Sequence, residues 1–123
     1  MSNQIVWVDI PIVDLDRAIS FYSGVLGTPI TKEGGPGFAF GLLPHSEGDV
    51  GGCLYLPGPE NAPSKMGPLI YLNVEGRLPQ AVESVPSSGG QVLKDIHEIG
   101  PHGFCAIVLD SEGNRIALHA PKA

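Results

Sequence analysis

The sequence predicts an α+β fold of two βαβββ modules, at about residues 4–57 and 68–120, that form a curved mixed sheet with a concave cup and helices outside. Three observations predict it: short β-branched runs between turns, one amphipathic helical stripe in each half, and the return of the same order of elements about 63 residues later. Neither half can bury its sheet face alone, so we interpret the repeat as one unit used twice within a single domain, 1–123. The alternative is a generic α+β sandwich with an accidental repeat.

The first half begins with a strand and a capped helix. The run Ile5–Ile12 is rich in β-branched residues and contains Pro11 near its end, which is typical of a strand. Asp14 is placed to cap the following helix, because its carboxylate can accept from free backbone N–H groups. The apolar stripe extends to Leu26, and Gly27 is expected to end the helix in a left-handed conformation. Three strands are predicted after it: Ile30–Glu33, Gly37–Leu43 and Val50–Leu56.

The second half repeats this order. A strand is predicted at Leu69–Val74, followed by a shorter helix that starts near Leu78 and that Pro86 is expected to end. Gly90 falls at the position that corresponds to Gly27. The turn before the last strand contains Gly113-Asn114, a pair suited to positive φ. The three predicted strands are Gln91–Asp95, Phe104–Asp110 and Arg115–His119.

The composition is that of a folded, acidic chain. Hydrophobic residues make up 42% and charged residues 16%, which favours a core over disorder. The net charge of −6 and the absence of a basic stripe exclude nucleic acid and disfavour an anionic membrane surface. Neither a signal-peptide pattern nor an apolar run of roughly 20 residues is present, so we expect a cytoplasmic protein with no membrane segment. Cys53 and Cys105 are isolated, which predicts reduced thiols rather than a disulfide framework.

Two segments resemble a known superfamily. VDIPIVDLDRAISFYSGVLG resembles the first strand and helix of the vicinal-oxygen-chelate (glyoxalase/bleomycin-resistance/extradiol dioxygenase) superfamily, and LDSEGNRIALHA resembles its closing hairpin. WVDIP and IGPHGF look like those of a subgroup of small bacterial members with no settled activity. The resemblance implies the two-module fold and a homodimer. It implies no single activity, because the superfamily includes lyases, isomerases, ring-cleaving dioxygenases, thiol transferases and metal-free drug-sequestering proteins.

The resemblance also locates the superfamily's metal ligands, which come from the first and last strand of each half. In this sequence those positions hold residues of other types: Trp7, Leu69, Ala117 and one of Cys53, Leu54 or Tyr55. Tryptophan, leucine and alanine offer no usable lone pair to a divalent ion. We therefore expect no metal at these positions and no cofactor. His97 and His102 flank Glu98 in a stretch rich in Gly and Pro, which predicts a loop rather than a metal site.

Strand alternation predicts which side chains face the cup. They combine aromatic and apolar groups with a few polar ones, as small-ligand pockets do: Trp7, Asp9, Cys53, Tyr55, Leu69, Tyr71, Asn73, Arg115, Ala117 and His119. Trp7 could stack on a flat ligand. Asp9 and His119 are the candidate proton-transfer residues, and Arg115 could stabilise an oxyanion.

These residues also have structural interpretations. Trp7 could be a core residue, Asp9 could form an ion pair with Arg115, and His119 could lie on the surface or in a dimer contact. Cys53 is expected to be a buried structural thiol, because nothing in the sequence supplies a base beside it.

Three functions remain open from the sequence. The first is a metal-free protein that binds a small organic molecule in its cup. The second is a lyase, isomerase or dioxygenase-type enzyme that uses Asp9 and His119 for acid–base chemistry or a relocated metal. The third is a non-catalytic interaction module whose cup is filled by its own side chains.

Overall fold

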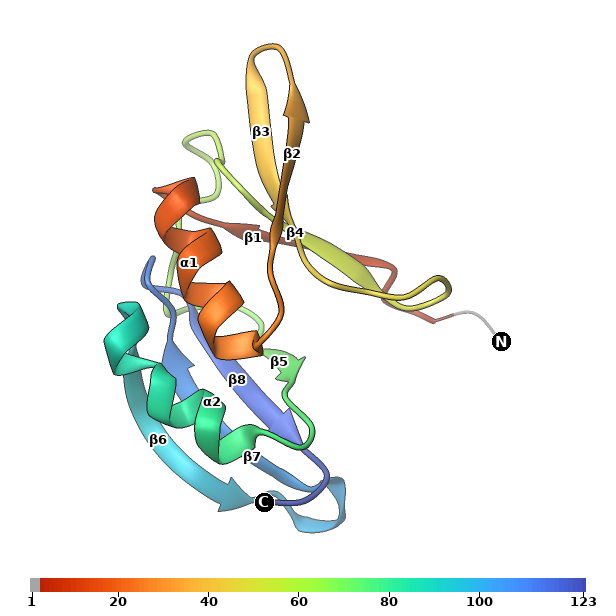
Figure 1. Cartoon of the computed structure of the whole chain (residues 1–123), viewed down its shortest axis with the longest axis vertical. Coiled ribbons are helices and arrows are strands. Elements are labelled where there is room, and N and C mark those ends of the chain that lie inside the picture. The colour runs from red at the N-terminus through yellow and green to blue at the C-terminus, as the bar shows by residue number, and fades with distance from the viewer. Residues whose placement is uncertain (1–2) are drawn as a thin grey trace.

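The computed structural model describes residues 3–123 and contains two four-stranded sheets, one from each half of the chain (Figure 1). The first sheet has the order β1-β4-β3-β2: β1 Trp7–Pro11, β2 Thr31–Gly35, β3 Phe38–Leu42 and β4 Gly51–Tyr55. The second has the order β5-β8-β7-β6: β5 Ile70–Asn73, β6 Gln91–Glu98, β7 Phe104–Leu109 and β8 Arg115–Ala120. In each sheet the first and last strands of the half pair in parallel, and the other neighbours are antiparallel. The predicted α+β fold of two βαβββ modules is confirmed, and the two sheets are open.

The helices lie side by side on one side of the two sheets (Figure 1). The first helix is α1 Leu15–Leu26 and the second is α2 Leu78–Ser84. Their apolar faces and the facing sides of the strands form one core, in which the largest fully buried side chains include Phe21, Tyr22, Ile10, Leu54 and Leu118. The opposite side of each sheet carries the predicted cup residues. Among residues 3–123, no helix is long and apolar enough to cross a membrane.

The ends of the helices follow the predicted signals with one correction. Asp14 caps α1 by accepting from the backbone N–H of Arg17 at 3.0 Å, and Gly27 is left-handed with φ 75°. After α2, a short 3₁₀ turn at Pro86–Ser88 shifts the left-handed position to Gly89, with φ 97°, so its assignment to Gly90 was wrong by one residue.

Two further corrections concern the second half. In the last turn Gly113 has positive φ and Asn114 does not, so the expectation for Asn114 was wrong; its side chain donates to Pro11 and Asp110. β6 extends to Glu98, so His97 and Glu98 lie in a strand and not in a loop. Irregular pairing between β6 and β7 lets β6 continue along its neighbour beyond the predicted end.

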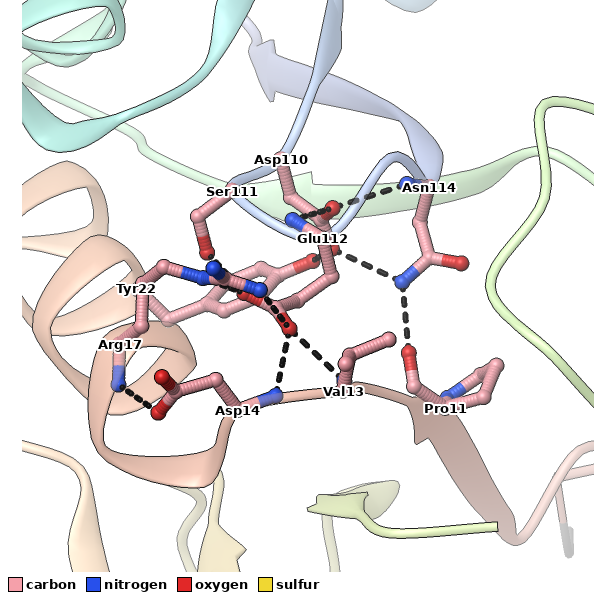
Figure 2. A network of polar contacts seen from close by, with 9 residues as sticks. All are labelled: Pro11, Val13, Asp14, Arg17, Tyr22, Asp110, Ser111, Glu112 and Asn114. Atoms are coloured by element: carbon pink, nitrogen blue, oxygen red, sulfur yellow. Dashed lines mark hydrogen bonds and ion pairs between the residues drawn. The ribbon is translucent and has the colours of Figure 1, made fainter. Parts of the chain in front are cut away.

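The β7–β8 turn of the second half docks on the start of α1 in the first half (Figure 2). The Glu112 carboxylate accepts from the backbone N–H groups of Val13 and Asp14, at 2.7 and 2.8 Å, and pairs with Arg17 Nε at 2.7 Å. Both N–H groups lie just before the first turn of α1, where an anion is also favourable for the helix dipole. Burial raises the pKa of the Glu112 carboxyl, but the hydrogen bonds outweigh it and lower that pKa to about 2.

A buried carboxylate, Asp110, fixes the same turn from within (Figure 2). It accepts from the Tyr22 hydroxyl at 2.5 Å, from the backbone N–H groups of Glu112 and Asn114 at 2.8 Å, and from Asn114 Nδ2 at 2.9 Å. Burial, and then the Asp110 charge, raise the pKa of Tyr22 well above its usual value. Asn114 Nδ2 also donates to the Pro11 carbonyl at 2.8 Å. The two halves are therefore joined by a satisfied polar network.

The other end of α1 is also held from the second half. Arg77, which precedes α2, reaches Gly27 and donates from Nη1 to the carbonyl of Val25. A cation at a helix C-terminus is favourable for the helix dipole and for the free carbonyl groups. α1 thus has an anion from the second half at its start and a cation from the second half at its end.

Candidate functional site

Trp7 lies on the open side of the first sheet, away from the helices. Its indole Nε1 donates to Asp9 Oδ1 at 2.7 Å, which fixes the orientation of the ring. The ring lies close to Gly51 on β4, where an added Cβ would stand 2.9 Å from Trp7 Cζ3. The residue is 46% exposed, so it is not a core residue. Trp7 is therefore an oriented aromatic side chain whose surface is open to solvent.

Asp9 contacts two neighbours on the same face. Besides the Trp7 indole, its Oδ1 accepts from the Cys53 thiol at 3.3 Å. Burial, followed by the hydrogen bond and charge of Asp9, raises the pKa of Cys53 to about 11. The thiol therefore stays protonated near neutral pH, which agrees with a structural role rather than a nucleophilic one.

Asp9 and Arg115 do not form the ion pair that was one interpretation of these two residues. Among residues 3–123 the ion pairs are Arg17–Glu112 and Lys32–Asp16. Arg115 instead donates from Nε to the backbone carbonyl of Lys65 at 3.2 Å. Asp9 instead accepts hydrogen bonds at Oδ1 from Trp7 and Cys53 of its own sheet.

The second sheet contributes a separate group of predicted site residues. Tyr71 and Asn73 on β5 pair with Ala117 and His119 on β8, so the four share one face. Tyr71 is 52% exposed, and its ring meets that of His119 edge-on at 6.3 Å between centroids. Ala117 is fully buried. His119 Nε2 lies 2.6 Å from the carbonyl of His102.

Two other predicted residues lie at the margins. Tyr55, at the end of β4, accepts a hydrogen bond from the side-chain amide of Asn61. Leu69 is half-buried just before β5. Neither borders the hollows described next, so the structure does not join them to the other candidates.

Five of the remaining candidates border three different hollows, whereas Trp7, Cys53 and Ala117 border none of the three. Asp9 and Arg115 border one of ≈ 240 Å³, on the seam between β1 and β5. Tyr71 and His119 border another of ≈ 400 Å³, together with His102. Asp9 and His119 are therefore not brought together as an acid–base pair.

The third hollow, of ≈ 380 Å³, lies between the first module and β5 and was missed by sequence reasoning. Tyr71 and Asn73 border it together with the β3–β4 turn, including His45 and Asp49. Sequence reasoning also missed the polar network around Glu112. No local signal marks it, because the same Ser-Glu-Gly occurs in the β3–β4 turn, where Glu47 is exposed.

The positions that the superfamily uses for metal do not fit a divalent ion here. Trp7 presents an N–H donor that Asp9 already accepts, and Leu69 and Ala117 carry only hydrocarbon. Among residues 3–123, no three His, Cys, Asp or Glu side chains converge as a metal site would require. The absence of metal and cofactor stays a prediction.

The comparisons with known proteins agree with this fold. Residues 4–118 match the family model of the Glyoxalase/Bleomycin resistance protein/Dioxygenase superfamily, and the chain therefore belongs to that superfamily. It is 31% identical over 126 residues to a glyoxylase-like domain-containing protein from Didymella fabae, covering 96% of this chain and 94% of the relative. The predicted place in a small bacterial subgroup is not confirmed.

Solved structures share the fold at low identity. A glyoxalase/bleomycin resistance protein from Albidiferax ferrireducens T118 superposes with a TM-score of 0.75 at 16% identity, covering 96% of this chain and 98% of that one. A glyoxalase-related enzyme from Fulvimarina pelagi gives a TM-score of 0.69 at 18% identity, with coverage of 96% and 88%. At these identities the likeness describes the fold alone.

Proposed function

We propose that this protein binds a small organic molecule with a flat, partly aromatic group, which it holds against Trp7 without the superfamily's usual metal. The observation that carries the proposal is the position and orientation of Trp7. It occupies a position where the superfamily has a metal ligand, and a hydrogen bond to Asp9 orients its half-exposed ring. An aromatic ring whose orientation is already fixed loses little conformational entropy when it stacks on a ligand. Trp7 itself borders none of the hollows, so its ring is a platform on the open face beside the hollow of ≈ 240 Å³ that Asp9 borders.

The Asp9 carboxylate beside Trp7 indicates which polar group the ligand carries. Both contacts of Asp9 use Oδ1, which leaves Oδ2 able to accept a hydrogen bond from the ligand. The net charge of −6 also disfavours an anionic molecule. We therefore expect a neutral or cationic ligand with an N–H or O–H donor next to its flat group.

The test uses the uncharged planar dye N-phenyl-1-naphthylamine, whose emission rises in an apolar site. We expect saturable binding of one dye per chain, with quenching of the single tryptophan. Trp7→Ala should weaken binding at least about fivefold, since stacking on an aromatic side chain contributes on the order of 1–3 kcal/mol. Phe38→Ala is the matched control, because Phe38 is a 62% exposed aromatic residue of the same sheet. Equal dye binding by the Trp7→Ala variant would refute the proposed site.

Acid–base catalysis by Asp9 and His119 has weaker support. The two side chains border different hollows, so one small substrate would not reach both. The hypothesis of a binding protein is therefore preferred over that of an enzyme that uses this pair.

We further propose a cytoplasmic homodimer that has neither nucleic acid nor membrane among its partners. The acidic net charge supports the exclusion of nucleic acid. Exposed apolar side chains away from Trp7, Leu56 and Met66 among them, offer surface that a second copy could cover. Sedimentation velocity should give twice the monomer mass of 12.9 kDa, and a single monomeric species at micromolar concentration would contradict the dimer.

A further inference from the structure

Three neighbouring strands of the second sheet place His97, Cys105 and His119 in one row. His97 on β6 pairs with Cys105 on β7, and Cys105 pairs with His119 on β8. Directly paired residues of antiparallel strands point to the same side of a sheet. The row lies on the side away from the helices, and it shares no residue with the proposed Trp7 site.

The first two members are already at the spacing of metal ligands. Cys105 Sγ lies 3.6 Å from His97 Nε2. In a tetrahedral zinc site the Zn–S and Zn–N bonds are about 2.3 and 2.05 Å, which puts such a sulfur and nitrogen about 3.6 Å apart. The pair therefore has the dimensions of one edge of a tetrahedral site.

The hydrogen bonds of both histidines leave the other ring nitrogen free to coordinate. His97 Nδ1 lies 2.8 Å from the carbonyl of Asp95, and His119 Nε2 lies 2.6 Å from the carbonyl of His102. A carbonyl only accepts, so these nitrogens carry the proton, and in the neutral rings His97 Nε2 and His119 Nδ1 keep their lone pairs. Histidines that ligate metals usually donate their second N–H in this way, which fixes the tautomer.

We propose that His97, Cys105 and His119 bind a divalent ion of borderline softness, such as Zn²⁺ or Co²⁺, with the fourth position open to water or a ligand. Among residues 3–123 the three side chains do not converge as they stand. The proposal therefore includes a turn of the His119 ring toward Cys105 when the ion binds. The hollow of ≈ 400 Å³ bordered by His119 and Tyr71 lies at the His119 end of the row and offers room for the fourth ligand. The Cys105 thiol loses its proton to solvent as the metal–sulfur bond forms.

The surroundings of the two cysteines differ, and that difference provides a control. Cys105 is 1% exposed, and burial raises the pKa of its thiol, partly offset by the charge of Lys94. Cys53 is buried too, but its thiol donates to the Asp9 carboxylate and not to an imidazole. A metal thiolate should therefore form at Cys105 and not at Cys53.

The experiment is a Co²⁺ titration of the tag-free protein, monitored by the near-ultraviolet charge-transfer absorption that a thiolate–cobalt bond produces. We expect the absorption to saturate at one ion per chain and to disappear when Zn²⁺ is added. Cys105→Ser should abolish it, His97→Gln and His119→Gln should weaken Co²⁺ binding at least about tenfold, and Cys53→Ser should leave it unchanged.

Two results would overturn the proposal: no charge-transfer absorption in the wild-type protein, or absorption that survives Cys105→Ser and is lost in Cys53→Ser. Circular dichroism checks that each variant is folded. If Cys105→Ser does not fold, the partly exposed His97 and His119 decide the question, since replacing them leaves the core intact. Binding of the planar dye at Trp7 should be the same in all three variants of the row, so failure of this site and failure of the Trp7 site are distinguishable.

Discussion

The two junctions between the modules have corresponding parts but different contacts. At one, the β7–β8 turn of the second half caps α1 of the first half, and Glu112 and Asp110 accept hydrogen bonds from both halves. At the other, the β3–β4 turn faces the end of β5, and a hollow of ≈ 380 Å³ separates them. α2 starts without a side-chain cap or an acidic residue in its first turn. The two copies of the module thus form two different junctions. We call the hydrogen-bonded one the closed junction and the one with the hollow the open junction.

The two turns show how small the chemical difference is. Both contain Ser-Glu-Gly, at residues 46–48 and 111–113. Glu112 has a fully buried side chain, whereas Glu47 is exposed, and among residues 3–123 no hydrogen bond joins its carboxylate to another group. His45 stands where the second turn has Asp110, so the open turn lacks the carboxylate that fixes the closed one. The closed junction contributes stability, and the open one leaves space that a ligand could enter.

The largest effect is expected from Asp110→Ala. This change removes the acceptor of the Tyr22 hydroxyl and of two backbone N–H groups, which are then buried without partners. We expect a loss of about 3–5 kcal/mol in the free energy of unfolding, measured in urea. The matched control is Asp49→Ala in the open turn, which removes only an exposed contact of 3.3 Å with the Ser46 N–H. Similar losses in both variants would contradict the comparison.

The next effect is expected from Glu112→Gln at neutral pH. The neutral amide cannot form an ion pair with Arg17, and its nitrogen cannot accept a hydrogen bond, so the start of α1 loses its anion. We expect a loss of about 2–3 kcal/mol in the free energy of unfolding. Glu47→Gln should change it by less than about 0.5 kcal/mol, as exposed substitutions do. An equal response in the two turns would mean that the cap on α1 contributes little.

Much of the fold could be predicted because its signals are local. Asp14 and Gly27 mark the ends of α1 through contacts within a few residues, and the structure has both where the sequence predicts them. The Gly90 assignment failed because it assumed an exact repeat, and a 3₁₀ turn after α2 moved the left-handed position to Gly89. His97 was assigned to a loop because Gly and Pro residues lie close to it in the sequence. That signal is weak, and pairing with β7 outweighs it by keeping His97 in a strand.

The candidate site was harder to predict because it depends on contacts between distant residues. Strand alternation placed Trp7 and Asp9 correctly on one face, but it gave no sign that the indole donates to the carboxylate. The same alternation cannot tell whether two residues of one face share a hollow, and Asp9 and His119 do not. Glu112 was overlooked because its partners lie 95 or more positions away in the chain.

The smallest effect is expected in the acid limb of the stability profile. The pKa of Glu112 is about 2 in the folded protein and near 4.5 when unfolded, so its contribution is complete above about pH 4.5 and is lost as the pH falls toward 2. By pH 3 the wild type should have lost about 2 kcal/mol of this contribution. Glu112→Gln has no such group to titrate, so the gap between wild type and variant should narrow from pH 7 to pH 3, whereas the gap for Glu47→Gln stays near zero. Urea midpoints measured from pH 7 to pH 3 check the stability differences of both variants. If the difference between wild type and Glu112→Gln stays constant, the contacts at α1 do not stabilise the Glu112 carboxylate. The distinction between a closed and an open junction would then rest on Asp110 alone.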